Sequence, residues 1–286
     1  MTGPSPALAV VGAGSLARSL LAGWRRAGVP FRSVTTVSRS ATRAAELVEP
    51  GVRALSIEDD PDAIERAVAG ADVVVVAVKP WMAPDVLPTI RGALTPGAVV
   101  VSVLAGVRVA ALREGLGTSE VVRVLPNTPS QVGAGFAGLV AGDAGVAAVA
   151  RVSALFAALG DVMTVDEDGL DALTVLSGSG PALVFLLTEK LAAAAERQGF
   201  DPDDARRIAR GVLVGAGALL ADTGEDPAEL RRRITSVQGV THHAVAVLEE
   251  RDLGGIVLEA ADAGLARARD LASASAPGAP RQGAAS

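Results

Sequence analysis

A glycine-rich turn near the amino terminus has the residue spacing of a dinucleotide-binding site. Gly12 and Gly14 follow a short apolar run, residues 7–11, and open an amphipathic segment over residues 15–27. In such a turn the first glycine permits the tight bend. The second lets the backbone approach a pyrophosphate at the amino end of a helix, where free N–H groups favour anions. The residues that this pattern assigns to the cofactor are Gly12, Gly14, Ser15 and Leu16.

The next apolar run, residues 33–37, ends in side chains that distinguish the two nicotinamide cofactors. NAD sites place an acidic residue here, which binds the ribose 2′-hydroxyl. This chain has Ser38 and Arg39 at that point, with Arg43 one helical turn further on. Hydroxyl and guanidinium groups bind a 2′-phosphate, which a carboxylate would repel. We therefore expect NADPH; the alternative is a solvated polar turn with no ligand.

The end of a third apolar run is a further candidate for the cofactor site. Ligands of open parallel sheets bind at the carboxyl ends of the strands, and this run ends there in Ala77, Val78, Lys79 and Pro80. Lys79 could act as a catalytic base, or it could be a solvent-facing or structural lysine.

The first half of the chain alternates such apolar runs with amphipathic segments. Continuous runs without strict alternation are typical of strands buried on both faces of a parallel sheet. The expected strands are residues 7–11, 33–37, 72–78, 98–103 and 121–125, and the expected helices are residues 15–27, 40–48, 62–69 and 84–91. Repeated units of this kind predict a Rossmann-type doubly wound α/β sheet over residues 1–165.

The second half has a different character, with long Ala- and Leu-rich segments and no strand pattern. It predicts an all-helical domain over residues 166–272, followed by a tail, residues 273–286, whose composition predicts disorder. The pairs Asp201-Pro202 and Asp226-Pro227 are typical of helix starts. The expected helices are residues 181–198, 202–222, 227–233, 241–250 and 254–271.

Composition excludes several classes of function. The chain of 286 residues has no cysteine, which excludes disulfides and thiolate chemistry, and its net charge of −6 argues against a nucleic-acid partner. The only histidines, His242 and His243, are adjacent, so they point about 100° apart on a helix and we expect no metal site. No signal peptide is evident and apolar runs such as residues 73–78 are too short to cross a bilayer, so we expect a cytoplasmic protein without a membrane partner.

Three segments together resemble the pyrroline-5-carboxylate reductases, NADPH-dependent enzymes that reduce a cyclic imine to proline. They are the glycine-rich turn, the run Ser177-Gly178-Ser179-Gly180-Pro181-Ala182 and the loop Thr235-Ser236-Val237-Gln238-Gly239-Val240-Thr241. By itself the second segment indicates a sharply shaped helix start. The similarity extends over about residues 8–271. It implies a Rossmann domain followed by an all-helical dimerisation domain, and a homodimer or higher oligomer with interleaved helices.

The resemblance also implies roles for particular residues. Segments matching Ala77-Val78-Lys79-Pro80 and Ala105-Gly106 line the cofactor in that family, and Pro126-Asn127-Thr128-Pro129 matches a further family segment. The loop amides bind the substrate carboxylate, and the last loop threonine, here Thr241, lies near the imine nitrogen as the catalytic residue. The substrate-binding residues implied in this way are Ser236, Gln238, Gly239, Val240 and Thr241.

The loop departs from the family pattern Thr-Ser-Pro-Gly-Gly-Thr-Thr at three positions. Val237 replaces the proline, Gln238 the first glycine and Val240 the first threonine. If position 238 uses a positive φ, a side chain there adds strain and bulk beside the carboxylate site. A substrate other than pyrroline-5-carboxylate would then be expected.

The expected function is NADPH-dependent reduction of a cyclic imine carboxylate, 1-pyrroline-5-carboxylate to L-proline. The alternatives are a reductase of a different cyclic imine in secondary metabolism and a non-catalytic NADP(H)-binding regulator. A β-hydroxyacid dehydrogenase would use a helical lysine, but the surroundings of Lys190 lack that family's glycine-rich motif.

Overall fold

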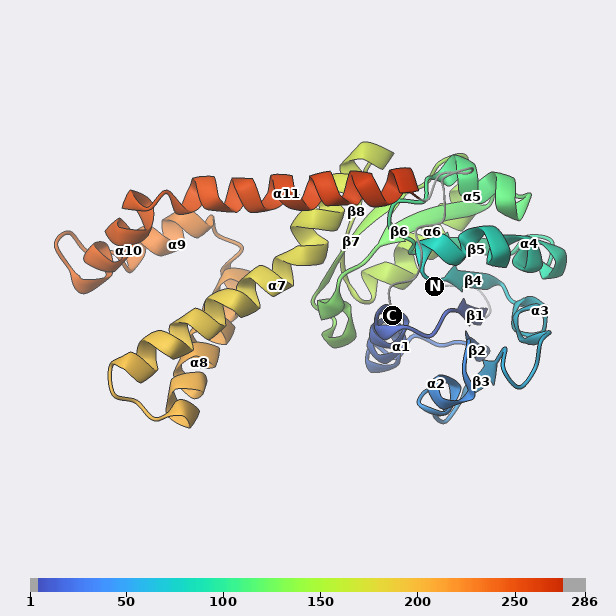
Figure 1. Ribbon diagram of the computed structural model, residues 1–286, viewed down its shortest axis with the longest axis horizontal. Coiled ribbons are helices and arrows are strands. Elements are labelled where there is room, and N and C mark those ends of the chain that lie inside the picture. The colour runs from blue at the N-terminus through green and yellow to red at the C-terminus, as the bar shows by residue number, and fades with distance from the viewer. Residues whose placement is uncertain (1–4, 275–286) are drawn as a thin grey trace. The chain divides into compact units, whose positions relative to one another are not determined.

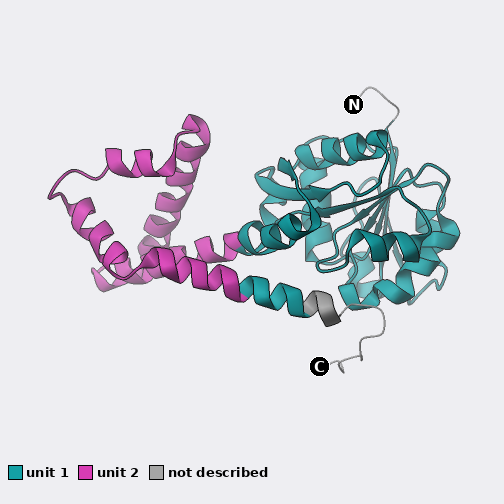
Figure 2. Ribbon diagram, turned by 90° about the horizontal axis from the view of Figure 1, so that it is seen from above, with its two compact units in different colours: residues 1–179, 264–286 teal, residues 180–263 magenta. Residues whose placement is uncertain are grey.

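The computed structural model describes residues 5–274 and divides them into two compact units. The first unit comprises residues 5–179 and 264–274, and the second comprises residues 180–263 (Figure 2). The predicted tail lies outside the described residues from position 275 onward.

The first unit is built on one twisted sheet (Figure 1). Its strands run in the order β3-β2-β1-β4-β5-β6-β7-β8, and all neighbours are parallel except β6 and β7. The order reverses between β1 and β4, as in a doubly wound dinucleotide-binding sheet, so the predicted Rossmann-type architecture is confirmed. The strands are β1 (Ala7–Val11), β2 (Ser33–Ser38), β3 (Val52–Ser56), β4 (Val73–Val76), β5 (Val99–Ser102), β6 (Val121–Leu125), β7 (Gly135–Val140) and β8 (Gly160–Thr164).

Helices cover both faces of the central strands, which is why β1 and β4 are apolar throughout. Along β1, Ala9 and Val11 belong to a core shared with α3, α4 and α5, whereas Leu8 and Val10 belong to a core shared with α1 and α6. The helices of this unit are α1 (Ser15–Arg26), α2 (Ala41–Ala45), α3 (Ala63–Val68), α4 (Ala83–Ala93), α5 (Val109–Leu116) and α6 (Val146–Ala157), with the short turns η1 (Pro80–Met82) and η2 (Thr128–Val132). Because α1 and α4 lie on opposite faces, the loops leading into them diverge at the switch point between β1 and β4, where doubly wound sheets bind their ligands.

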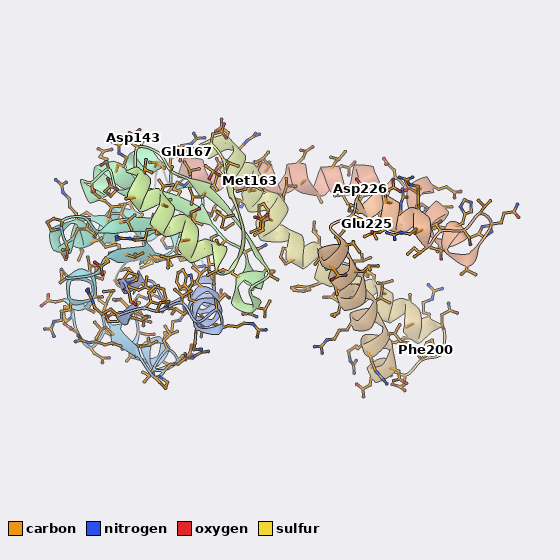
Figure 3. The ribbon with its side chains drawn as sticks, turned by 180° about the vertical axis from the view of Figure 1, so that it is seen from behind. Asp143, Met163, Glu167, Phe200, Glu225 and Asp226 are labelled. Carbon is orange, nitrogen blue, oxygen red and sulfur yellow. The ribbon has the colours of Figure 1, made fainter. Side chains whose placement is uncertain are left out.

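The long helix α7 (Glu167–Arg197) corrects the sequence prediction of a helix start near Pro181. It runs without a break through Ser177–Ala182, so that glycine-rich segment lies inside a helix. Its first residue, Glu167 (Figure 3), accepts hydrogen bonds from the Val109 N–H at 2.9 Å and from the buried Arg123 Nη1 at 2.6 Å. These bonds fix the beginning of α7 to β6 and to the start of α5.

The second unit continues α7 and adds α8 (Pro202–Thr223), α9 (Pro227–Arg233), α10 (Val240–Glu250) and the first half of α11 (Leu253–Ala274). Both predicted helix starts are confirmed. The Asp201 carboxylate accepts from the N–H groups of Asp203 and Asp204, which lowers its pKa, and Asp226 (Figure 3) accepts from the Ala228 N–H at 2.7 Å.

The second unit has almost no core of its own. Within residues 180–263, all of which the structure describes, the buried residues are Ala205 and Ala209. Large apolar side chains are exposed on α7, α8, α10 and α11, for example Phe185, Val212 and Leu258. By length and composition α7 could also cross a bilayer, the one described helix of which this is true. An apolar surface of this extent indicates an interface.

Candidate active site

The glycine-rich turn follows β1 and packs directly on the end of β4. Gly12 has φ 104°, and a Cβ atom there would lie 2.6 Å from the carbonyl carbon of Ala77 and from the Val78 nitrogen. Only glycine fits this position. Gly14 differs, because a Cβ atom there would meet nothing within 4 Å. The first glycine therefore shapes the protein, and the second leaves open space in front of the helix.

The amino end of α1 fits the pyrophosphate of a dinucleotide. Gly14 is the N-cap residue and so provides no capping side chain, and the first turn, which contains Ser15 and Leu16, has no acidic residue. The first N–H groups of a helix need an acceptor from outside it, and an anion is the favoured one.

The end of β2 presents cations to the same edge of the sheet. Arg39 and Arg43 are exposed and form no ion pair within the described part of the chain. Ser38 is buried, and its Oγ has no hydrogen-bond partner among the described residues. Ion pairing does not occupy these two guanidinium groups, so they are available to a 2′-phosphate.

Two residues at this edge were not predicted from the sequence. Glu58 follows β3, a strand that is not among those expected from the sequence, and its carboxylate accepts from the Ala41 N–H at 2.9 Å. Trp81 lies in η1 directly after Lys79-Pro80 and is 69% exposed. Exposure distinguishes a tryptophan that could bind a ligand from one in the core, and the sequence alone does not give the exposure of Trp81.

The ends of β4 and β5 complete the edge. The Ala77 N–H donates to the Val11 carbonyl at 2.8 Å, which places residues 77–80 beside the glycine-rich turn. Lys79 is exposed, and Gly106, next to Ala105, has φ 74° in the turn after β5. The parallel sheet therefore brings all the predicted cofactor segments to one edge.

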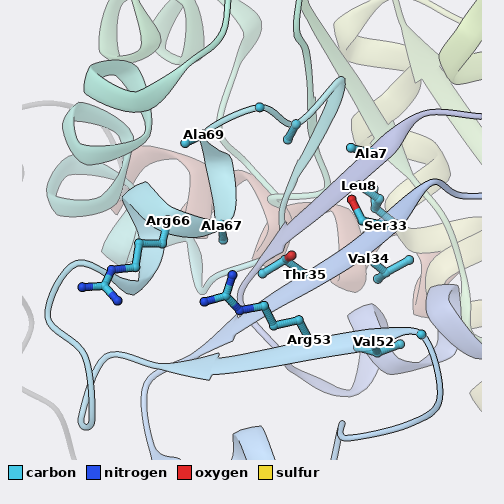
Figure 4. A pocket seen from close by; sticks show the side chains of 13 residues that line it. Ala7, Leu8, Ser33, Val34, Thr35, Val52, Arg53, Arg66, Ala67 and Ala69 are labelled. Carbon is cyan, nitrogen blue, oxygen red and sulfur yellow. The ribbon is translucent and has the colours of Figure 1, made fainter.

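A groove of about 520 Å³ lies at the opposite edge of the sheet, near the amino ends of β1, β2 and β3. Arg53 and Arg66 are among the residues that line it (Figure 4). It contains none of the residues assigned to the cofactor, and ligands of doubly wound sheets bind at the carboxyl edge. This groove is therefore not the nucleotide site.

The predicted substrate loop belongs to the second unit and ends in the helix α10. Gln238 has φ 58°, so this position does use the left-handed conformation that favours glycine. A Cβ atom at Gly239 would lie 2.3 Å from Ser236 Oγ and 3.1 Å from the Ser236 carbonyl oxygen, so Gly239 packs closely on the start of the loop.

The loop leaves the first turn of α10 open to an anion. Gly239 is the N-cap residue and gives no side-chain cap, and the first turn, which contains Thr241, has no acidic residue. Val237 and Val240 are each 90% exposed. The N–H groups that begin α10 could bind a carboxylate, with Thr241 beside them.

Two family models match this chain. The model described as "Pyrroline-5-carboxylate reductase dimerisation" matches residues 167–271, and the model described as "NADP oxidoreductase coenzyme F420-dependent" matches residues 7–106. The first covers α7 to α11, and the second covers the crevice half of the sheet.

Curated relatives match almost the whole chain. Pyrroline-5-carboxylate reductase from Pseudomonas aeruginosa is 34% identical over 271 residues, covering 94% of this chain and 97% of that protein. The enzyme of the same name from Pisum sativum is 34% identical over 266 residues, covering 92% of this chain and 95% of that protein.

Solved structures of similarly named enzymes also superpose on this chain. A pyrroline-5-carboxylate reductase from Coxiella burnetii superposes with a TM-score of 0.83 at 30% identity, covering 93% of this chain and 98% of that one. Pyrroline carboxylate reductase from Plasmodium falciparum, solved with NADP bound, has a TM-score of 0.80 at 23% identity with the same coverage, and this supports the fold.

Proposed function

Because this chain belongs to the pyrroline-5-carboxylate reductase family, we propose that it reduces 1-pyrroline-5-carboxylate to L-proline with NADPH. The observation that carries the proposal is the match to curated reductases along nearly the full chain. The two family models cover the glycine-rich turn and the loop before α10. The predicted family, fold class and enzyme class are confirmed by the same matches.

In this proposal the first unit holds the cofactor at the carboxyl edge of its sheet. The uncapped start of α1 binds the pyrophosphate, and Arg39 and Arg43 bind the 2′-phosphate. Residues 77–80 and 105–106 border the nicotinamide half, because they follow β4 and β5 beyond the switch point.

The second unit supplies the substrate site. The N–H groups at the start of α10 hold the carboxylate, and the Thr241 hydroxyl bonds the ring nitrogen. When bound, NADPH supplies a hydride to the imine carbon. The protonated imine is already an electrophile, so the protein contributes chiefly by holding the two reactants in register. This fits a loop without a histidine–carboxylate pair.

We further propose that the active unit is at least a homodimer in the cytoplasm. The exposed apolar faces of α7, α8 and α11 lie within the segment matched by the dimerisation model. A second copy would cover them, and it would also account for the apolar composition of α7. Each site would then combine the cofactor edge of one chain with the loop of the other.

A mixing experiment tests the shared site. Gly14→Ala impairs the cofactor turn and Thr241→Ala impairs the substrate loop, so each homodimer has low activity. In a mixed dimer with shared sites, one site carries both changes and the other carries neither. Activity recovered on co-refolding supports the proposal. No recovery, or a fully active monomer of 28.6 kDa by light scattering, contradicts it.

A reductase of a different cyclic imine remains the second candidate, and Gln238 favours it. Its left-handed backbone places a side chain where the family pattern has glycine. A substrate panel distinguishes the two candidates. NADPH oxidation is followed with pyrroline-5-carboxylate and with the corresponding six-membered and four-membered ring analogues. The highest kcat/KM with the five-membered ring supports the proposal, and a preference for another ring supports the second candidate.

A further inference from the structure

One carbonyl group inside α7 has lost its helical hydrogen-bond donor. In an α-helix the N–H of residue i+4 donates to the carbonyl of residue i. The residue four positions after Ser177 is Pro181, which has no N–H group. Because Ser177 is only partly exposed, its carbonyl is expected to take a donor from outside the helix.

Asn127 supplies that donor. Its Nδ2 atom donates to the Ser177 carbonyl oxygen at 3.1 Å, and its Oδ1 atom accepts from the Phe136 N–H at 2.9 Å. The side-chain amide has one donor end and one acceptor end, and only this orientation satisfies both partners. With 8% of the residue exposed, Asn127 is committed to these two contacts.

The surrounding segment gives the helix little help of its own. Gly178 and Gly180 flank this point, and a Cβ atom at either would meet nothing within 4 Å. Glycine and proline are the least favourable residues in a helix interior. The helix nevertheless continues through them. A hydrogen bond from outside is therefore most consequential at this turn.

A second helix-interior proline, Pro88 in α4, provides a comparison in which no side-chain donor is needed. Pro88 in α4 removes the donor for the carbonyl of Pro84, an exposed residue at the start of that helix. Water can satisfy an exposed carbonyl, so no protein side chain is needed there. Pro88 is a matched control for Pro181.

We propose that Asn127 is a positioning residue for the reaction, acting through α7. It replaces the hydrogen bond that Pro181 removes and so holds the helix where α7 passes from the first unit into the second. The consequence for catalysis rests on the proposed function. The coupling between Asn127 and Pro181 does not rest on the proposed function, because it can be measured by unfolding the protein.

A double-mutant cycle in urea, at one concentration of the full chain, measures that coupling. Asn127→Ala should raise the unfolding equilibrium constant by at least about tenfold more in the wild-type background than in Pro181→Ala, where the new N–H satisfies Ser177. Pro88→Ala should give no such relief. An Asn127→Ala chain that folds only together with Pro181→Ala also supports the proposal. Equal losses in both backgrounds, or failure to fold in both, would overturn it.

Kinetics separate positioning from direct cofactor binding. Asn127→Ala should lower kcat/KM for the imine about tenfold while the Kd for NADPH stays within about twofold, and Pro181→Ala should restore most of the loss. If the Kd for NADPH rises to the same extent in both backgrounds, Asn127 contacts the cofactor itself and the positioning role is wrong. If the imine is not reduced at all, the unfolding cycle still decides the coupling.

Discussion

The Glu58 carboxylate accepts a hydrogen bond of 2.9 Å from the N–H of Ala41, the first residue of α2. The Glu58 N–H in turn donates to the carbonyl of Arg39 at 3.1 Å. A negative charge therefore lies at the turn where Arg39 is proposed to bind the 2′-phosphate of NADPH. The selectivity for NADPH over NADH should depend on both side chains.

Removing the charge of Glu58 should strengthen NADPH binding. Glu58→Gln keeps an acceptor for the Ala41 N–H and ends the repulsion of the phosphate. We expect the Kd for NADPH to fall about two- to fivefold, the range typical of exposed charge pairs, with the Kd for NADH unchanged. Glu120→Gln is the matched control. The Glu120 carboxylate also accepts from a backbone N–H, that of Gly145, but Glu120 precedes the amino end of β6. Fluorescence titration measures both constants, and tighter binding of NADH as well would exclude a 2′-phosphate effect.

Reversing the charge of Arg39 should have the opposite effect. Arg39→Asp should weaken NADPH binding about tenfold or more and retain most of the activity with NADH, because only NADPH carries the 2′-phosphate. Arg53→Asp is the control, since Arg53 is an exposed arginine at the opposite edge of the same sheet (Figure 4). Initial rates with each cofactor provide the comparison. Equal loss with both cofactors would show that Arg39 has another role.

The two glycines of the first turn should respond differently to alanine. Gly14→Ala should leave the Tm within a few degrees and weaken NADPH binding, because the added methyl group meets no protein atom but enters the space of the pyrophosphate. Gly12→Ala should lower the Tm markedly, because its methyl group would overlap the end of β4 at a φ of 104°. Thermal denaturation with and without NADPH tests the pair. A stable Gly12→Ala protein would contradict the close packing.

Restoring glycine at position 238 should favour the five-membered substrate. Gln238→Gly relieves about 1 kcal/mol of left-handed strain and loses a similar amount through a freer unfolded chain, so stability should change little. The kcat/KM for pyrroline-5-carboxylate should rise several-fold because bulk is removed beside the carboxylate site. Asp252→Gly is the control, since Asp252 has φ 52° but its carboxylate also bonds the Gly255 N–H. An unchanged kcat/KM would mean that position 238 does not set the substrate range.

The hydroxyl of Thr241 should matter for the reaction and not for the fold. Thr241→Ala should lower kcat/KM by about one to two orders of magnitude, close to the effect of one lost hydrogen bond in a water-excluded site. Thr235→Ala removes a hydroxyl that bonds the Arg231 carbonyl at 2.7 Å, so it should act through stability instead. Steady-state kinetics beside circular dichroism separate these effects. Full activity of the Thr241→Ala variant would show that Thr241 is not part of the substrate site.

Much of the fold could be predicted, because continuous apolar runs of this length are typical of buried strands in a parallel sheet. The ranges 7–11 and 121–125 match β1 and β6 residue for residue. β3 was missed because Arg53 and Ser56 interrupt its apolar pattern, and β8 because this edge strand is mostly exposed. Glu58 was missed with β3. The segment 177–182 was wrongly assigned to a helix start, because its glycines and proline disfavour a helix locally and the contact with Asn127 comes from 50 residues away.

The most direct test of the central claim is the product of a single defined reaction. Purified protein is incubated with NADPH and racemic 1-pyrroline-5-carboxylate, and NADPH oxidation at 340 nm is compared with the amount of proline resolved on a chiral column. The proposed function predicts one molecule of L-proline for each NADPH oxidised, with no D-proline above the level of a no-enzyme control. NADPH binding without proline formation, despite an intact fold, would contradict it.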